Sequence, residues 1–190
     1  MEIIFATHNI HKTEEARAIL ADKFSIKNLH DIECPEIPET AETLKGNAFI
    51  KAQYVAEHYH CNCFADDTGL EIEALDGRPG VFSARYAGEN CSFKDNMRKV
   101  LKEMDGVSNR NACFKTVIAL LMNGQTYYFE GRVDGVITTN ERGTEGFGYD
   151  PIFLPNGFDK TFAEMDSATK NNISHRGIAM QKLVDFLKNC

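Results

Sequence analysis

Apolar runs and helix-like patterns alternate along the first third of the chain. Residues 2–6, which are apolar from Ile3 to Ala6, predict a buried strand, and residues 11–21 carry apolar side chains at helical spacing. The segment 31–42 is acidic and contains prolines, which predicts a loop. Thr43 precedes a second stretch with helical apolar spacing, so we expect it to cap a second helix.

The middle of the chain predicts one short strand and one helix with a clear start. Residues 63–65 are apolar, and we expect this strand to end at Asp66-Asp67-Thr68-Gly69, a sequence typical of turns. Ser92, with Asp95 three residues later, predicts the capping box of a third helix. We expect Phe93 to begin the apolar face of that helix.

Two long β-rich segments, 112–122 and 125–136, flank Asn123-Gly124. Asn-Gly between two such runs is the strongest short-range signal for a β-hairpin. Helical spacing returns over about 176–188 near the end of the chain. Helices and strands that alternate early, followed by an antiparallel hairpin, predict an α/β fold with a mixed sheet, in a single domain over residues 1–190.

Composition narrows the class of protein. The chain is 43% hydrophobic and 26% charged, so a sizeable core can be buried and disorder is not expected. A net charge of −7 argues against a nucleic-acid-binding surface, although a local basic pocket can still hold a small phosphate ligand. No apolar run is long enough for a membrane span and no signal peptide is visible, so we expect a cytoplasmic protein without membrane association. The six cysteines have no repeated spacing and are expected to be free thiols.

The segment from Thr7 to Lys12 joins the first predicted strand to the first predicted helix. A helix N-terminus offers unpaired N–H groups and a partial positive charge to an anion, and Lys12 adds a full charge. Thr7 and Asn9 add short polar side chains. The segment favours phosphate binding, and a capped helix with a solvated lysine is the alternative.

Two adjacent aspartates, Asp66 and Asp67, follow the predicted strand. Successive side chains of a strand point to opposite faces, so one aspartate can enter a ligand site while the other stabilises the turn. Mg²⁺ prefers carboxylate oxygens together with phosphates and water, and Glu39 in the acidic loop could supply a second carboxylate. A simple turn is the alternative.

Gly146 to Pro151 places two aromatic residues, Phe147 and Tyr149, among glycines. Glycines let a backbone approach a flat ligand closely, and an aromatic ring can stack on a base. His175 and Arg176, directly before the last predicted helix, add hydrogen-bond donors. The alternative is a structural loop followed by a charged helix start.

Two other patterns carry less weight. Residues that resemble metal ligands have a spacing that matches no paired zinc pattern, so we do not favour a zinc site at His58, His60, Cys61 and Cys63. The glycines between 143 and 148 do not form the dinucleotide fingerprint, and the sequence has no Walker-type phosphate loop.

Together, the polar segments resemble one family, the inosine triphosphate pyrophosphatases, which act on deaminated purine nucleotides. The resemblance runs from Ile3 to nearly the C-terminus in the order of the family's motifs. Those motifs are Thr7-x-Asn9-x-x-Lys12, Glu39-Thr40, Asn47-Ala48, Lys51-Ala52, Ala65 to Leu70, Pro79 to Tyr86, Gly146 to Pro151, Lys170, and Ser174 to Gly177. The chain departs from the family at Ala41, where glycine is usual, and at Thr68, which replaces a common serine but keeps the hydroxyl.

The resemblance implies an architecture and a set of roles. It implies an elongated mixed β-sheet with flanking helices, two lobes around a central nucleotide-binding cleft, and a homodimer. Glu39 and Asp67 are implied as Mg²⁺ ligands, and Asp67 also as the proton acceptor. The implied substrate contacts are Thr7, His8, Asn9, Ile10, His11, Lys12, Thr68, Phe147, Gly148, Tyr149, Asp150, Lys170, His175 and Arg176.

The resemblance also predicts the reaction. ITP, dITP and XTP are expected to be hydrolysed to the nucleoside monophosphate and pyrophosphate by water attack at the α-phosphorus, with Asp67 or a water on the metal as base. Donors from His175 or Arg176 would suit the C6 oxygen of hypoxanthine or xanthine and reject the amino group of adenine, and Asp150 could accept from ring N1.

Three alternatives stay open. They are a related pyrophosphatase acting on pyrimidine or modified nucleotides, a nucleotide sensor without catalysis, and an α/β domain that binds a protein partner. The roles of Asp66 and Arg85 cannot be assigned from the sequence.

Overall fold

The structure is a computed structural model that describes residues 2–20 and 24–189. The strands are β1 (Glu2–Phe5), β2 (Ser25–Lys27), β3 (Cys63–Ile72), β4 (Pro79–Gly80), β5 (Asn111–Met122), β6 (Gln125–Ile137) and β7 (Phe153–Pro155). The α-helices are α1 (Ile10–Leu20), α2 (Leu44–Tyr59), α3 (Phe93–Glu103), α4 (Ser167–Ile173) and α5 (His175–Leu187). Short 3-10 turns lie at η1 (Glu73–Leu75), η2 (Ser83–Arg85), η3 (Asp150–Ile152) and η4 (Phe162–Glu164).

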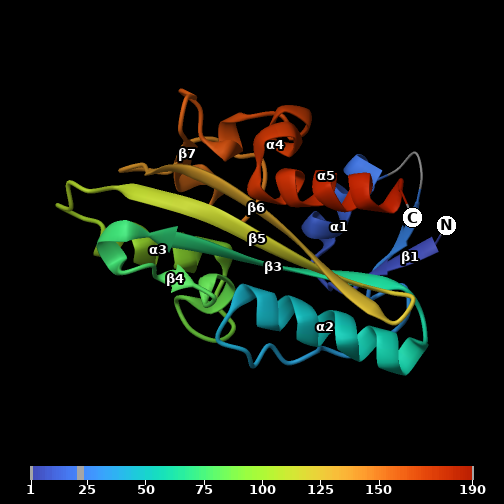
Figure 1. Cartoon of the computed structure of the whole chain (residues 1–190). Coiled ribbons are helices and arrows are strands. Elements are labelled where there is room, and N and C mark those ends of the chain that lie inside the picture. Colours follow the sequence, from blue (N-terminus) through green and yellow to red (C-terminus); the bar gives the residue numbers. More distant parts are fainter. Residues whose placement is uncertain (1, 21–23, 190) are drawn as a thin grey trace. The chain divides into compact units, whose positions relative to one another are not determined.

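The strands form one mixed sheet in the order β2-β1-β3-β5-β6-β7, with β4 paired to β3 (Figure 1). β1 pairs in parallel with both β2 and β3, whereas β4 is antiparallel to β3 and β7 is antiparallel to β6. This confirms the predicted α/β class with a mixed sheet. Among the described residues, every helix is too short or too polar to cross a membrane.

The chain folds into two compact units. Unit 1 comprises Met1–Asp67, Thr116–Gly131 and Arg176–Cys190, and unit 2 comprises Thr68–Lys115 and Arg132–His175. The chain passes from one unit to the other within β3, β5 and β6 and at the start of α5. A single domain over residues 1–190 therefore stays a prediction, and each unit is described by itself.

Unit 1 is a sheet covered on both faces, and the side-chain alternation of β1 shows how. Ile3 and Phe5 belong to a buried cluster with residues of α1 and α5, whereas Ile4 and Ala6 belong to another with residues of α2. Figure 1 shows α1 and α5 over one face of this part of the sheet and α2 over the other. A strand that is buried on both faces has a continuous apolar run, as residues 3–6 do.

The same alternation continues through β3, which is longer than predicted. Phe64 packs on the α1 and α5 side and Ala65 on the α2 side, so Asp66 and Asp67 follow on opposite faces. The expectation that the strand ends at Asp66-Asp67-Thr68-Gly69 is wrong, because β3 runs through this sequence to Ile72. Aspartate and glycine disfavour strands locally, but buried ion pairs and hydrogen bonds to the two carboxylates stabilise the extended backbone here.

Unit 2 has its own core, built from β3, β5, α3 and the 3-10 turns. Its largest fully buried side chains include Ile72, Met104, Phe153 and Phe162. The predicted capping box of α3 is confirmed, because the Ser92 and Asp95 side chains each accept the other's backbone N–H. The prediction that Phe93 lies on the buried face of this helix is wrong, since Phe93 is 44% exposed.

Local signals located the remaining elements well. Asn123 and Gly124 form the predicted hairpin turn with φ values of 52° and 75°, the left-handed conformation that this turn requires. Thr43 caps α2 as predicted, and α1 and α5 match their predicted ranges to within one residue, with Ala21 outside the described residues. The cysteines in the described part of the chain are free thiols, and Cys190 lies outside it.

Candidate functional site

The turn between β1 and α1 is ordered by the side chains that were predicted to contact phosphate. Asn9 Oδ1 accepts the Lys12 backbone N–H at 3.2 Å, and Thr7 Oγ1 accepts the Asn9 N–H at 3.1 Å. Asn9 therefore caps the first turn of α1. The capped helix start matches the alternative prediction for this segment. The solvated lysine of that alternative is absent, because the Lys12 side chain is only 14% exposed.

The other residues of this turn differ in exposure. His8 is half-buried, and its Nε2 lies 2.8 Å from the carbonyl oxygen of Cys34, which links the turn to the acidic loop. Ile10 is 59% exposed. His11 is exposed, and its Nδ1 lies 3.9 Å from Glu14.

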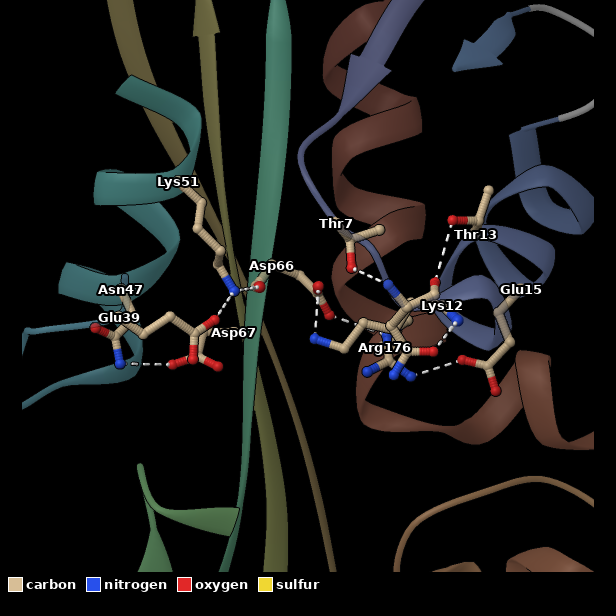
Figure 2. Close-up of polar contacts among 11 residues, drawn as sticks. Thr7, Lys12, Thr13, Glu15, Glu39, Asn47, Lys51, Asp66, Asp67 and Arg176 are labelled. Carbon is tan, nitrogen blue, oxygen red and sulfur yellow. Dashed lines mark hydrogen bonds and ion pairs between the residues drawn. The ribbon is translucent and has the colours of Figure 1, made fainter. Parts of the chain in front are cut away.

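Asp66 connects two cations, the mostly buried Lys12 and the buried Arg176, on the α1 and α5 side of β3. Its Oδ1 accepts from Lys12 Nζ at 2.8 Å and its Oδ2 from Arg176 Nε at 3.0 Å (Figure 2). Arg176 Nη1 also donates to Glu15 at 2.6 Å. Burial alone would raise the pKa of Asp66, but Lys12 and Arg176 outweigh it and hold that pKa well below its usual range. Asp66 is therefore an ionised anchor for Lys12 and Arg176.

Asp67 enters a different set of contacts on the α2 side of β3. Its Oδ2 accepts from Asn47 Nδ2 at 3.2 Å, and Asn47 Oδ1 accepts the Ala41 N–H at 2.9 Å. Lys51 Nζ donates to Glu39 Oε1 at 2.5 Å and to the Asp66 carbonyl oxygen at 2.7 Å. Asn47 and Lys51, one helical turn apart on α2, thus tie the acidic loop to β3.

The carboxylates of Glu39 and Asp67 lie in the same part of the view in Figure 2, and the charge of Glu39 acts on Asp67. Burial raises the pKa of Asp67. The positive charges of Lys51 and Lys12 lower this pKa and the negative charge of Glu39 raises it, so that it lies above its usual value. Two carboxylates within reach of each other's charge form a suitable pair for a divalent cation, whose charge would relieve their repulsion.

The donor set fits Mg²⁺ better than a metal held by protein ligands alone. Mg²⁺ is usually bound through one or two carboxylates and completes its shell with phosphates and water. Within residues 2–20 and 24–189, no group of three or more His, Cys, Asp or Glu side chains is placed to hold a metal ion. A site at Glu39 and Asp67 would therefore take its remaining oxygens from phosphates and water.

Lys51 and Asn47 were given no role from the sequence, although a signal was present. Both lie in a helix whose Ala48, Ala52 and Val55 are fully buried, and Asn47 and Lys51 are themselves 0% and 8% exposed. A lysine at helical spacing within an apolar face is seldom buried unless it is paired. That pattern could have identified Lys51 as a partner for carboxylates.

Unit 2 brings a second set of predicted site residues together around Asp150. Asp150 Oδ2 accepts the Phe147 backbone N–H at 2.8 Å and accepts from Lys170 Nζ at 2.7 Å. Lys170 Nζ also lies 5.0 Å from the centre of the Phe147 ring, within range of a cation–π contact. Asp150 and Lys170 are almost completely buried, so this ion pair orders the glycine-rich loop.

Glycine is required at position 146 of this loop. Its φ is +73°, and a Cβ there would lie 2.1 Å from Asp150 Oδ2. Gly148 also has a positive φ, +66°, but no described atom lies within 4 Å of the position that its Cβ would take. The loop can thus approach Asp150 closely only because residue 146 has no side chain.

The remaining predicted residues of unit 2 are largely buried. The Tyr149 side chain lies in the core, where its hydroxyl donates to the Ser83 carbonyl oxygen at 2.8 Å and burial raises its pKa. His175 is 3% exposed and stacks on Phe114 with ring centroids 4.4 Å apart. Thr68 is half-buried on β3.

Comparisons with known proteins agree with these features. The profile of the Ham1 family matches residues 3–186. A dITP/XTP pyrophosphatase of Flavobacterium johnsoniae is 53% identical over 188 residues, 98% of each chain, and one of Porphyromonas gingivalis is 53% identical over 98% of this chain and 97% of its own. The structure of a HAM1 protein from Coxiella burnetii has a TM-score of 0.92 at 39% identity, with 100% of both chains covered. The resemblance inferred from the motifs is confirmed, and the chain belongs to the Ham1 family.

Proposed function

We propose that the chain is a nucleoside triphosphate pyrophosphatase that hydrolyses dITP, XTP and ITP to the nucleoside monophosphate and pyrophosphate. Relatives with 53% identity over nearly the whole chain are named dITP/XTP pyrophosphatases. The observation that carries the proposal is the pair of carboxylates, Glu39 and Asp67, held by Lys51 and Asn47 on one side of β3. The names of the relatives do not favour pyrimidine nucleotides.

Unit 1 is assigned the triphosphate. The capped N-terminus of α1 presents backbone N–H groups and a partial positive charge, and Lys12 adds a full charge in the same turn. Asp66 and Glu15 hold Lys12 and Arg176 in fixed positions, so little side-chain entropy is lost when an anion binds.

Glu39 and Asp67 are assigned the metal. Mg²⁺ bound there would neutralise charge on the phosphates and on the departing pyrophosphate. Lys51 holds the Glu39 carboxylate in place, and Asn47 does the same for Asp67. Both supports come from α2, so the rigidity of this helix fixes the separation of the two carboxylates.

Asp67 is assigned the proton transfer. A water oxygen attacks the α-phosphorus, the bond from that phosphorus to the bridging oxygen breaks, and pyrophosphate leaves with the electron pair. The proton released by the water passes to the Asp67 carboxylate. A carboxylate positioned beside the attacking water can accept this proton.

Unit 2 is assigned the base. Of the two candidate donors to the C6 oxygen, we assign this contact to His175, because Nε and Nη1 of Arg176 donate to Asp66 and Glu15. Adenine would place an amino group against this donor and leave buried polar groups unpaired, at a cost of about 1–3 kcal/mol each. Phe147 is assigned the stacking contact. Asp150 and Lys170 order the loop that carries it.

The proposal also includes a cytoplasmic homodimer, as the family resemblance implies. Light scattering coupled to size-exclusion chromatography would give the mass in solution, which is expected to be twice the 21.3 kDa of one chain. A mass of one chain at micromolar concentration would remove this part of the proposal.

A substrate panel tests the function. Purified protein with Mg²⁺ is supplied separately with ITP, dITP, XTP, ATP, GTP and CTP, and the monophosphate is measured by chromatography. We expect kcat/KM for the first three to exceed that for ATP by at least about 10²-fold, because more than one polar contact is lost with adenine. Equal turnover of ATP and ITP would contradict the assignment of the base site.

A further inference from the structure

The first residue of α3, Phe93, is held in a fixed position although its side chain is 44% exposed. The Asp95 backbone N–H donates to Ser92 Oγ at 3.2 Å, and the Ser92 N–H donates to Asp95 Oδ2 at 2.9 Å. This capping box fixes the backbone on both sides of Phe93. Met97 and Val100, farther along the helix, anchor α3 in the core of unit 2.

The exposed ring of Phe93 is in contact with the loop that carries the predicted stacking residue. The ring centroids of Phe93 and Phe147 are 6.0 Å apart with an interplanar angle of 44°. Aromatic pairs favour separations of about 4.5–7 Å in tilted or offset arrangements. A single exposed phenylalanine is common on protein surfaces and does not by itself indicate a function. The contact between the two rings is what indicates a role for Phe93.

The backbone of Phe147 is held by the hydrogen bond from its N–H to Asp150, whereas its ring depends on contacts of its own. Phe147 lies between Gly146 and Gly148, both with positive φ, and glycine has the widest conformational freedom of any residue. Lys170 lies over its ring at 5.0 Å, and Phe93 adds a second contact from a helix that packs in the core. Rigid support of a binding residue lowers the entropy that is lost when a ligand binds.

We propose that Phe93 is a positioning residue that holds the Phe147 ring in the orientation needed to stack on a purine base. The inference rests on the proposed function, in which Phe147 contacts the base. Phe93 does not act on the reacting phosphates, so its loss weakens substrate binding and leaves the chemical step unchanged.

Steady-state kinetics with ITP and Mg²⁺ test this role in the full-length protein. Phe93→Ala is expected to raise KM by about 2- to 10-fold, the worth of one aromatic pair, and to leave kcat within about 2-fold. Phe93→Tyr keeps the ring and is expected to restore the KM of the unmodified protein. Phe158→Ala is the matched control, because Phe158 is 43% exposed in a different segment of the same unit, and its KM should not change.

A double-mutant cycle separates this role from a general structural one. In a Phe147→Ala background, Phe93→Ala should raise KM no further, because the ring that it positions is gone. Each of three results would overturn the inference while turnover of ITP persists. The first is an unchanged KM for Phe93→Ala, and the second is a similar rise in KM for Phe158→Ala. The third is a full additional rise in KM when Phe93→Ala is added to Phe147→Ala. If the unmodified protein turns over none of ITP, dITP and XTP, the proposed function fails and this inference fails with it.

Discussion

Asp66 and Asp67 are neighbours in the chain, yet their carboxylates have different surroundings because strand geometry directs them to opposite faces of β3. Asp66 is completely buried and pairs with Lys12 and Arg176. Asp67 accepts a hydrogen bond from Asn47, and the negative charge of Glu39 raises its pKa. A one-residue shift along this strand would exchange the two environments.

This separation predicts opposite phenotypes for two matched substitutions. Asp67→Asn removes the proposed base and one metal ligand, and is expected to lower kcat by about 10²-fold or more with an unchanged melting temperature. Asp66→Asn leaves the buried charges of Lys12 and Arg176 poorly compensated, which should cost about 3 kcal/mol of folding stability. At about 2–4 °C per kcal/mol for a chain of this size, the melting temperature would fall by roughly 6–12 °C.

Calorimetry and ITP turnover on both variants check this pair. As a control, each variant is expected to keep the far-ultraviolet circular dichroism spectrum of the unmodified protein at 20 °C. For Asp66→Asn, the spectrum is recorded below the lowered melting temperature of that variant. Full activity in Asp67→Asn would remove its assigned role. An unaltered melting temperature in Asp66→Asn would show that the buried ion pairs contribute little.

Of the residues around the proposed cation site, Asp67 was predicted from the sequence and Lys51 was not. Two adjacent aspartates at the end of a predicted strand suggested a cation site, and alternation along a strand correctly predicted that they point to opposite faces. The place of Lys51 within the apolar face of α2 indicated a buried, paired lysine but not its partners, because Glu39 and the Asp66 carbonyl oxygen are 12 and 15 residues away in sequence. Pairings of that range depend on tertiary structure, which local patterns do not contain.

At the scale of elements, features with local causes were predicted and features with distant causes were not. The Asn123-Gly124 hairpin and the caps at Thr43 and Ser92 are each decided within a few residues, and all three are present. The extension of β3 beyond Ala65 was missed because partners from α1, α2 and α5 stabilise it. β2 and β4 have only three and two residues and depend on pairing with neighbouring strands.

The glycine-rich loop provides a prediction at this scale. Gly146→Ala and Gly148→Ala both place a side chain at positive φ, which costs roughly 1–2 kcal/mol. Only Gly146→Ala also drives a methyl group into the Asp150 carboxylate, which should cost about 1–3 kcal/mol more and displace the group that holds Lys170. We expect Gly146→Ala to be the less stable variant in urea unfolding and the one with the higher KM for ITP.

Gly148→Ala is the control for backbone strain in that comparison. If the two variants lose equal stability and bind ITP equally well, close packing of the loop on Asp150 has no functional weight. A larger loss for Gly148→Ala would contradict the account of the loop directly.

At the scale of the whole molecule, each unit contains its own group of predicted site residues. Unit 1 contains Glu39, Asp67 and the turn from Thr7 to Lys12, and unit 2 contains Asp150 and Lys170. Neither unit is a continuous segment of the chain, since unit 1 combines three segments and unit 2 combines two. The full-length protein is therefore the form in which the reaction is tested.

In the proposed reaction, water attacks the α-phosphorus of a deaminated purine nucleoside triphosphate. The most direct test is turnover of ITP with Mg²⁺ in ¹⁸O-labelled water, with mass spectrometry of the products and Asp67→Asn as the inactive control. Attack at the α-phosphorus is expected to give IMP that carries one ¹⁸O atom and pyrophosphate that carries none. Labelled pyrophosphate, or IDP with labelled phosphate, would contradict it.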